Sequence, residues 1–130
     1  MIFVIWILFI IADAYWNAIK IKRNIHIFHG FEAIYRSIAS LSLWAIAHIH
    51  ELNLLQNICF ALGCFFSGWL IFNITLNAFR ELPITYLGEA SILDRLEALC
   101  PSRIATMFFK FCLATGAMSA FYYGTLNPMG

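Results

Sequence analysis

Four ionisable side chains lie inside otherwise apolar stretches of the sequence, and they are the residues best suited to do chemistry. They are Asp13, Glu32, Arg36 and Lys110. A charge surrounded by hydrocarbon is costly unless it pairs with an opposite charge or faces water, so such residues often mark ion or proton pathways. Two acids and two bases sum to zero charge, which is what a closed network of ion pairs requires.

Spacing along the chain predicts a common height for these residues. Asp13 lies seven residues before Lys20, and Lys110 lies seven residues after Arg103. At about 1.5 Å per residue, each lies roughly 10 Å inside the end of its helix. The same reasoning in the other helices predicts one layer of polar side chains, made of Asp13, Asn17, Glu32, Arg36, Asn73, Asn77 and Lys110.

Within this layer we expect Asp13 to pair with Arg36. Glu32 lies one helical turn before Arg36, so it either shares the same guanidinium or reaches Lys110. In one interpretation the layer is structural and fixes the register of the helices. In the other it lines a hydrated cavity, open to the cytoplasm, that binds a proton, an ion or a polar head group. Lys110 alone has a further option, which is to extend its amine to the membrane surface.

No catalytic signature accompanies the polar layer. The sequence has no phosphate-binding glycine loop, no nucleophile elbow and no His-Glu-x-x-His helix. Its cysteines lack a usual metal-ligand spacing: they are Cys59, Cys64, Cys100 and Cys112. No run of like charge suggests a nucleic-acid partner. We therefore expect no catalytic residues, no metal, no cofactor and no nucleic-acid binding.

Four apolar stretches position the polar residues, at about 2–19, 31–49, 54–79 and 104–123. Each reaches the roughly 17 to 25 residues needed to cross a bilayer. The chain of 130 residues is 62% hydrophobic and 12% charged, so it carries more apolar surface than a soluble domain of this size can bury. We predict a single-domain, all-α integral membrane protein over residues 1–130, built as a bundle of four transmembrane helices. Its expected partner is the lipid bilayer that surrounds the bundle.

Basic residues predict the orientation of this bundle. Six of the eight lie in the loops 20–30 and 80–103, whereas the segments 48–53 and 124–130 contain none. Loops rich in Lys and Arg stay in the cytoplasm. Both termini are therefore expected on the outer side of the cytoplasmic membrane.

The second basic loop contains a helical pattern of its own. Ser91 stands three residues before Asp94 as a cap, and Pro101 supplies a stop. The apolar residues between them follow helical spacing: Ile92, Leu93, Leu96 and Leu99. We predict a short amphipathic helix at about 91–100 on the cytoplasmic membrane surface. The alternative is a capped connector that only shortens the loop.

Rows of small residues predict where helices touch. The rows are Gly63 with Ser67 and Cys64 with Gly68 in the third stretch, and Cys112, Gly116 and Ala120 in the fourth. Small residues four apart let two backbones approach closely. The third and fourth helices should therefore pack on each other or across a homodimer.

Several motifs follow one another along the chain: Asp13-Ala14-Tyr15-Trp16-Asn17, Trp69-Leu70-Ile71-Phe72-Asn73, Leu76-Asn77-Ala78-Phe79-Arg80, Tyr86-Leu87-Gly88 and Ile92-Leu93-Asp94-Arg95-Leu96. Together they resemble a group of small uncharacterised membrane proteins of bacterial, phage and prophage genomes, over about half of the chain. Asn17 and Asn73 replace acids of that pattern, and Glu81 replaces a glycine. The resemblance implies a bacterial or phage origin and a cytoplasmic-membrane location, and it implies no activity.

The function expected from these features is non-enzymatic: a membrane protein that acts by associating with itself or with another membrane protein. A phage setting favours a holin-like pore former or an exclusion protein as the first alternative, because such pores need little beyond self-associating helices. A small proton-coupled or ion-coupled transporter is the second alternative. It would use the intramembrane charges of Asp13, Arg36 and Lys110.

Overall fold

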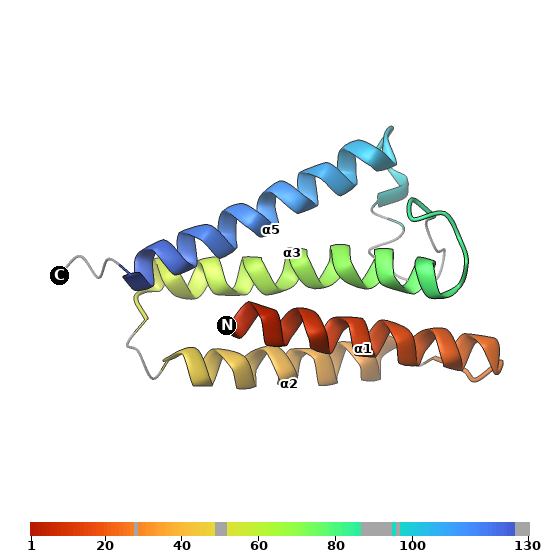
Figure 1. The fold of residues 1–130 in the computed structure, drawn as a ribbon, viewed down its shortest axis with the longest axis horizontal. Coiled ribbons are helices and arrows are strands. Elements are labelled where there is room, and N and C mark those ends of the chain that lie inside the picture. The colour runs from red at the N-terminus through yellow and green to blue at the C-terminus, as the bar shows by residue number, and fades with distance from the viewer. Residues whose placement is uncertain (28, 49–51, 87–94, 96, 127–130) are drawn as a thin grey trace.

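The computed structural model describes residues 1–27, 29–48, 52–86, 95 and 97–126. In that part of the chain it contains four long helices and no strand, which confirms the all-α prediction. The helices are α1 (Ile2–Lys22), α2 (His29–His48), α3 (Leu54–Phe79) and α5 (Arg103–Leu126). In Figure 1, α3 runs between α5 and the pair formed by α1 and α2. The long helices alternate in direction, so α1 and α3 end, and α2 and α5 begin, at one end of the molecule, which we call the basic end.

Three of the helices are long and apolar enough to cross a membrane: α1, α3 and the first 22 residues of α5. This supports the predicted class, a membrane protein. The helix α2 has 20 residues but is not among the three. Its charged residues and serines lower its hydropathy: they are Glu32, Arg36, Ser37, Ser40 and Ser42. The predicted span at 31–49 is therefore found as a helix, with residue 49 outside the described part.

Local side-chain chemistry explains where α3 starts and stops. At its start, Asn53 Oδ1 accepts from the Gln56 backbone N–H at 2.9 Å, and Gln56 Oε1 accepts from the Asn53 N–H at 2.7 Å. This reciprocal capping box provides acceptors for two backbone N–H groups that have no carbonyl partner within the helix. In its last turn, Asn77 Nδ2 donates to the carbonyl oxygens of Ile84 and Tyr86. These bonds fold the chain that follows α3 back toward the helix.

Glu81 has a backbone φ of 58°, in the left-handed region that favours glycine. It follows the α3 cap residue, where a left-handed residue commonly turns the chain away from a helix. The turn after α3 is therefore made with a non-glycine residue in the left-handed region.

Aromatic side chains form the core at the end opposite the basic end, which we call the aromatic end. The rings of Phe3 from α1, Phe60 from α3 and Phe121 from α5 are each 2–3% exposed. Their centroids lie 5.5 to 5.6 Å apart in all three pairs. Next to them, the Trp6 indole N–H donates to the Cys64 carbonyl at 3.0 Å. Three helices are thus joined by interlocking rings.

Glycines of α3 receive the aromatic rings of α1. A Cβ on Gly63 would lie 2.9 Å from the Phe3 ring, and a Cβ on Gly68 would lie 3.0 Å from the Trp6 ring. The row that contains Gly63, Ser67 and Gly68 therefore receives rings of α1, whereas we had expected it to contact the fourth span or a second copy of the chain. A Cβ on Gly63 would also lie 3.4 Å from Met118 of α5, so this row does reach the fourth span. The reason is size: a ring occupies the space that a helix backbone was expected to fill.

The small residues of α5 lie outside the packed core. A Cβ on Gly116 would meet nothing within 4 Å. Ala120 and Cys112 are exposed. The helices α3 and α5 do pack on each other, but α5 contributes Ala114 and Phe121 to the buried set. The expectation that Gly116 and Ala120 form this contact was wrong.

The predicted amphipathic helix at 91–100 lies largely outside the described residues. Of that segment the structure describes residue 95 and residues 97–100. Arg95, Glu97 and Ala98 are helical. The position of the helix on a membrane surface stays a prediction.

Candidate functional site

Asp13 is the centre of a buried polar cluster between α1 and α2. Its carboxylate, in a residue that is 7% exposed, accepts from Arg36 Nε at 2.7 Å. It also accepts from the Tyr35 hydroxyl and from Asn17 Nδ2 at 3.0 Å. A buried carboxylate is tolerated when its lone pairs are satisfied in this way. The structure thus contains the predicted pair of Asp13 with Arg36, and it adds a tyrosine that the sequence reasoning missed.

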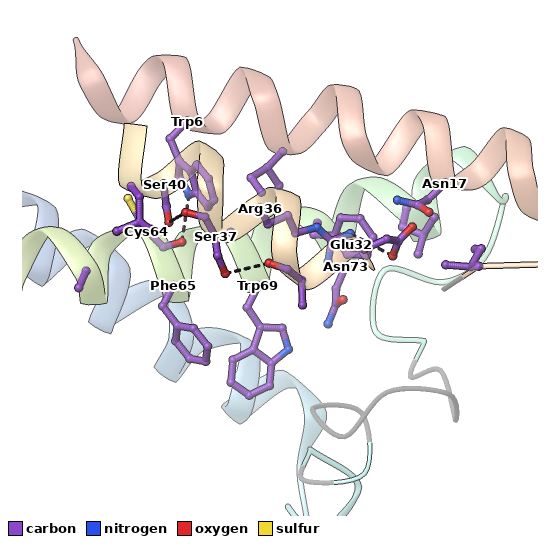
Figure 2. Close-up of a pocket in the computed structure, with 18 of the residues that line it drawn as sticks. Trp6, Asn17, Glu32, Arg36, Ser37, Ser40, Cys64, Phe65, Trp69 and Asn73 are labelled. Carbon is purple, nitrogen blue, oxygen red and sulfur yellow. Dashed lines mark hydrogen bonds and ion pairs between the residues drawn. The ribbon is translucent and has the colours of Figure 1, made fainter. Parts of the chain in front are cut away.

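Glu32 extends this cluster into a chain of ion pairs. It is 3% exposed, and its two oxygens lie 3.5 Å from Arg36 Nη2 and 3.6 Å from Lys20 Nζ. The guanidinium of Arg36 also lies 4.1 Å from the centroid of the Phe72 ring on α3. Two acids and two bases balance, and they tie α2 to its neighbours near the basic end (Figure 2). We call this set, Asp13, Lys20, Glu32 and Arg36, the ion-pair clamp.

Lys110 belongs to a different site. It is 2% exposed, it forms an ion pair with Glu97, and its Nζ lies 3.9 Å from the centroid of the Trp69 ring. Among the described residues, no ion pair joins Lys110 to the ion-pair clamp. In the described part of the chain the predicted network therefore divides into two separate sets of ion pairs, while the common height of the polar residues stays a prediction. Glu97 was missed; the signal for it was a buried lysine that needed an acid from the loop before its own helix.

The asparagines of the predicted layer have three different roles. Asn17 is buried and bonds to the carbonyl and carboxylate of Asp13. Asn77 holds the turn after α3, as described above. Asn73 is half-buried on α3, and its side chain makes no hydrogen bond to another described residue. Among the described residues, Asn73 therefore keeps its whole amide available to a ligand, whereas in Asn17 only the buried Oδ1 lacks a partner.

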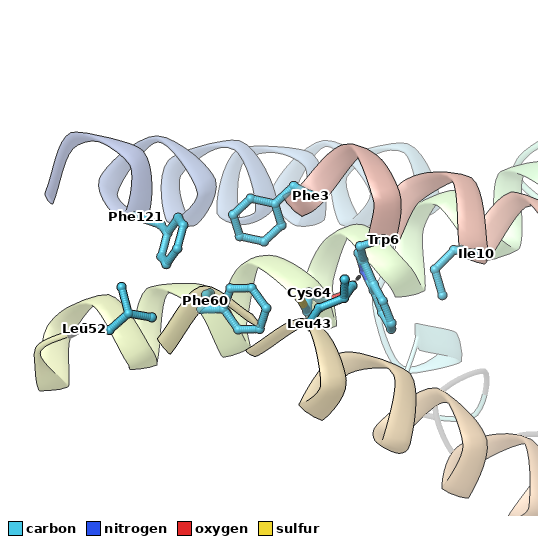
Figure 3. Close-up of a cluster of buried hydrophobic side chains, with 9 residues drawn as sticks. Phe3, Trp6, Ile10, Leu43, Leu52, Phe60, Cys64 and Phe121 are labelled. Carbon is cyan, nitrogen blue, oxygen red and sulfur yellow. Dashed lines mark hydrogen bonds between the residues drawn. The ribbon is translucent and has the colours of Figure 1, made fainter. Parts of the chain in front are cut away.

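A second clamp holds α2 near the aromatic end. Trp44 Nε1 donates to Asn57 Oδ1 on α3 at 2.6 Å. Leu43 and Ala47 of α2 are buried in the core cluster, and Leu43 lies beside the core rings in Figure 3. We call the pair of Trp44 and Asn57 the indole clamp. The helix α2 is thus fixed to the rest of the molecule at both ends.

Between the two clamps α2 stands away from α3 and leaves a lateral groove of about 850 Å³. Small residues face each other across it, Ala33, Ser37 and Ser40 from α2 and Ala61, Cys64 and Gly68 from α3. Trp6 and Ile10 of α1 form its floor. In Figure 2, Glu32 and Arg36 of the ion-pair clamp lie toward one end of this groove, and Trp6 lies near Ser40 and Cys64 further along.

Hydroxyl groups in the groove are satisfied within α2 itself. Ser37 Oγ donates to the Ala33 carbonyl at 2.8 Å, and Ser40 Oγ donates to the Ser37 carbonyl at 2.9 Å. Such bonds to the preceding turn let serine sit in an apolar environment. The middle of the groove therefore offers a ligand mainly apolar contacts.

The basic end of the groove is polar. Arg80, Asn73 and Tyr86 line it beside the ion-pair clamp. The Arg80 guanidinium lies 5.8 Å from the centroid of the Tyr86 ring. No ion pair joins Arg80 to a carboxylate among the described residues. The groove is consequently amphipathic along its length.

No family model matches this chain, and neither the curated proteins nor the solved structures contain a significant match to it.

Proposed function

We propose that this chain is a multi-pass protein of a bacterial cytoplasmic membrane that binds one lipid-like amphiphile in the groove between α2 and α3. The observation that carries the proposal is the groove itself, which is apolar in its middle and polar at its basic end. Its volume of about 850 Å³ falls in the range of roughly 300 to 1,000 Å³ that is usual for small-molecule sites. The basic end is the cytoplasmic end in this proposal, as the positive loops predict.

The proposal includes α2 as a fourth transmembrane helix. Its 20 residues make a rod about 30 Å long, which equals the thickness of the hydrocarbon layer. Its outward side is apolar, with Ile34 and Ile38 each 58% exposed. Its charges are paired in the ion-pair clamp. A lipid environment would therefore meet apolar side chains and satisfied polar groups, as it requires.

The lining of the groove favours an extended hydrocarbon chain, because the middle of the groove is apolar and the Ser37 and Ser40 hydroxyls there are already bonded within α2. A groove that opens sideways in hydrocarbon is filled by whatever chain is near it. We propose binding and no catalysis, because both carboxylates at the site, Asp13 and Glu32, are already held by cations.

Groove blocking tests this proposal. Ser37→Phe places a ring in the groove, whereas Ile38→Phe places the same ring on the outward face of α2 and serves as the matched control. Each protein is purified in mild detergent, and the lipid that remains bound is counted by native mass spectrometry. We expect the Ser37→Phe protein to retain at least fivefold less lipid than the control, since a ring fills much of the groove's width. Equal lipid in both proteins would contradict the proposal.

A second candidate function, association with itself or another membrane protein, rests on the exposed row of Cys112, Gly116 and Ala120. Small residues on a lipid-facing helix let a second helix approach closely. A protein in which Cys59 and Cys100 are replaced by serine reports on this face, because Cys112 is then the exposed thiol that an oxidant can crosslink. A Cys112 dimer that disappears in Gly116→Leu would support association. Monomer alone in native membranes would exclude it, and with it a pore built on this face.

A further inference from the structure

The cations near the basic end of the groove differ in whether a carboxylate lies beside them. Arg36 lies 2.7 Å from Asp13 and 3.5 Å from Glu32, and Lys20 lies 3.6 Å from Glu32. These four charges cancel. Arg80 has the Tyr86 ring beside it but no carboxylate among the described residues. Since a guanidinium stays charged in any environment, this end of the groove keeps one positive charge.

Among the residues that the structure describes, no other acid neutralises Arg80. Glu81 follows it in sequence, but its side chain is exposed, it does not line the groove, and no ion pair joins the two. Arg80 itself is half-buried at the end of α3. The negative end of the helix dipole favours a cation there. Arg80 is therefore held at the mouth of the groove with its charge available.

Asn73 supplies a second polar group deeper in the same groove. It lies seven residues, or about 10 Å, before Arg80 along α3 and on nearly the same face, because seven residues make almost two full turns. Its amide makes no hydrogen bond to another described residue. The groove thus offers a cation at its mouth, an amide further in and apolar walls beyond.

We infer that the occupant is an anionic glycerophospholipid of the inner leaflet. Its phosphate binds Arg80, an ester carbonyl accepts from the Asn73 amide, and one acyl chain follows the groove toward Trp6. The order of groups in such a lipid, phosphate then ester then hydrocarbon, matches the order of Arg80, Asn73 and the apolar walls. Guanidinium groups bind phosphate by paired, charge-assisted hydrogen bonds. This inference rests on the proposed function and adds the identity of the head group.

Lipid competition tests the inference. The purified protein is reconstituted into vesicles of equal parts phosphatidylglycerol and phosphatidylcholine, extracted gently, and analysed for the ratio of the two lipids that stay bound. We expect the wild-type protein to enrich phosphatidylglycerol about tenfold over the bulk ratio, because both lipids carry a phosphate but only phosphatidylglycerol carries a net negative charge to balance Arg80. Arg80→Gln should bring the bound ratio back to that of the vesicles, and Arg80→Lys should keep part of the enrichment.

The matched control is Arg103→Gln, which removes the same charge at the same end of the molecule from a residue that does not line the groove. It should leave the enrichment unchanged. Wild-type protein without enrichment, or enrichment that survives Arg80→Gln, would overturn the inference. If Ser37→Phe lowers the total bound lipid while the wild-type protein binds the two lipids in the bulk ratio, the groove binds lipid without selecting an anionic head group, and the inference fails while the proposed function stands. If Ser37→Phe changes nothing, the proposed function fails as well.

Discussion

The two flanks of α3 are built in opposite ways. On the flank that faces α1, large residues meet small ones: Phe3 and Trp6 fill the space over Gly63 and Gly68. On the flank that faces α2, the lining mixes small residues such as Ser37 and Ala61 with the rings of Phe65 and Phe72, and a groove of about 850 Å³ remains. In lipid there is little hydrophobic drive to close such a gap, so close packing depends on shape. The comparison shows why one flank is a core and the other is available to a ligand.

The same comparison explains the polar clamps. The α1 flank needs few polar contacts because interlocked rings fix the helices. The α2 flank has no such interlock along its middle, so ion pairs at one end and an indole hydrogen bond at the other hold α2 in place. Polar groups of this kind specify register when packing does not.

The largest expected effect comes from breaking the ion-pair clamp. Asp13→Asn leaves the Arg36 guanidinium without its closest partner, and loss of one member of a buried pair costs about 3 kcal/mol. We expect the free energy of unfolding in mixed detergent to fall by this amount. The double variant Asp13→Asn with Arg36→Gln should recover more than half of it. A single variant as stable as the wild type would show that the clamp does not hold α2, and lost activity in such a stable protein would favour the transporter interpretation.

A smaller effect is expected from filling the packed flank. Gly63→Leu forces a side chain against the Phe3 ring and should lower the free energy of unfolding by about 2 kcal/mol, as overpacking does. Ala61→Leu, two residues away, points its added volume at the groove and is the matched control. It should change stability by less than about 0.5 kcal/mol. Equal losses in the two proteins would mean that the two flanks are not packed differently.

The smallest effect is expected at the indole clamp. Trp44→Phe removes the hydrogen bond to Asn57 and keeps a ring, so it should cost about 1 kcal/mol. Trp16→Phe is the control, because Trp16 is 56% exposed and belongs to no clamp. Unfolding measured by circular dichroism distinguishes the two. A loss in Trp16→Phe as large as that in Trp44→Phe would remove the indole clamp from the account.

The sequence was sufficient to predict the helices and one ion pair. The apolar stretch 54–79 coincides with α3, because hydrophobic length is a local property. Asp13 and Arg36 were paired correctly, since two buried opposite charges near the same helix end have few other partners. The partner of Lys110, Glu97, was missed because it comes from the segment before α5, whose path is not encoded in spacing.

The groove could not be predicted from sequence. The rows of small residues were visible, but their partners depend on which helix faces them. Gly63 received a ring from α1, and Gly116 faces open space. A cavity exists only where two small faces meet, which is a property of the assembled fold and not of either row.

Quenching of Trp6 fluorescence by a brominated acyl chain tests the central claim most directly. Trp6 is 4% exposed, yet it forms the floor of the groove. In a protein whose other three tryptophans are replaced by phenylalanine, a bromine reaches this indole only from inside the groove. The account predicts strong quenching in vesicles of brominated phosphatidylglycerol and its loss when Ser37→Phe is added. Trp6 fluorescence that brominated lipid leaves unchanged would contradict the claim that a lipid chain occupies the groove.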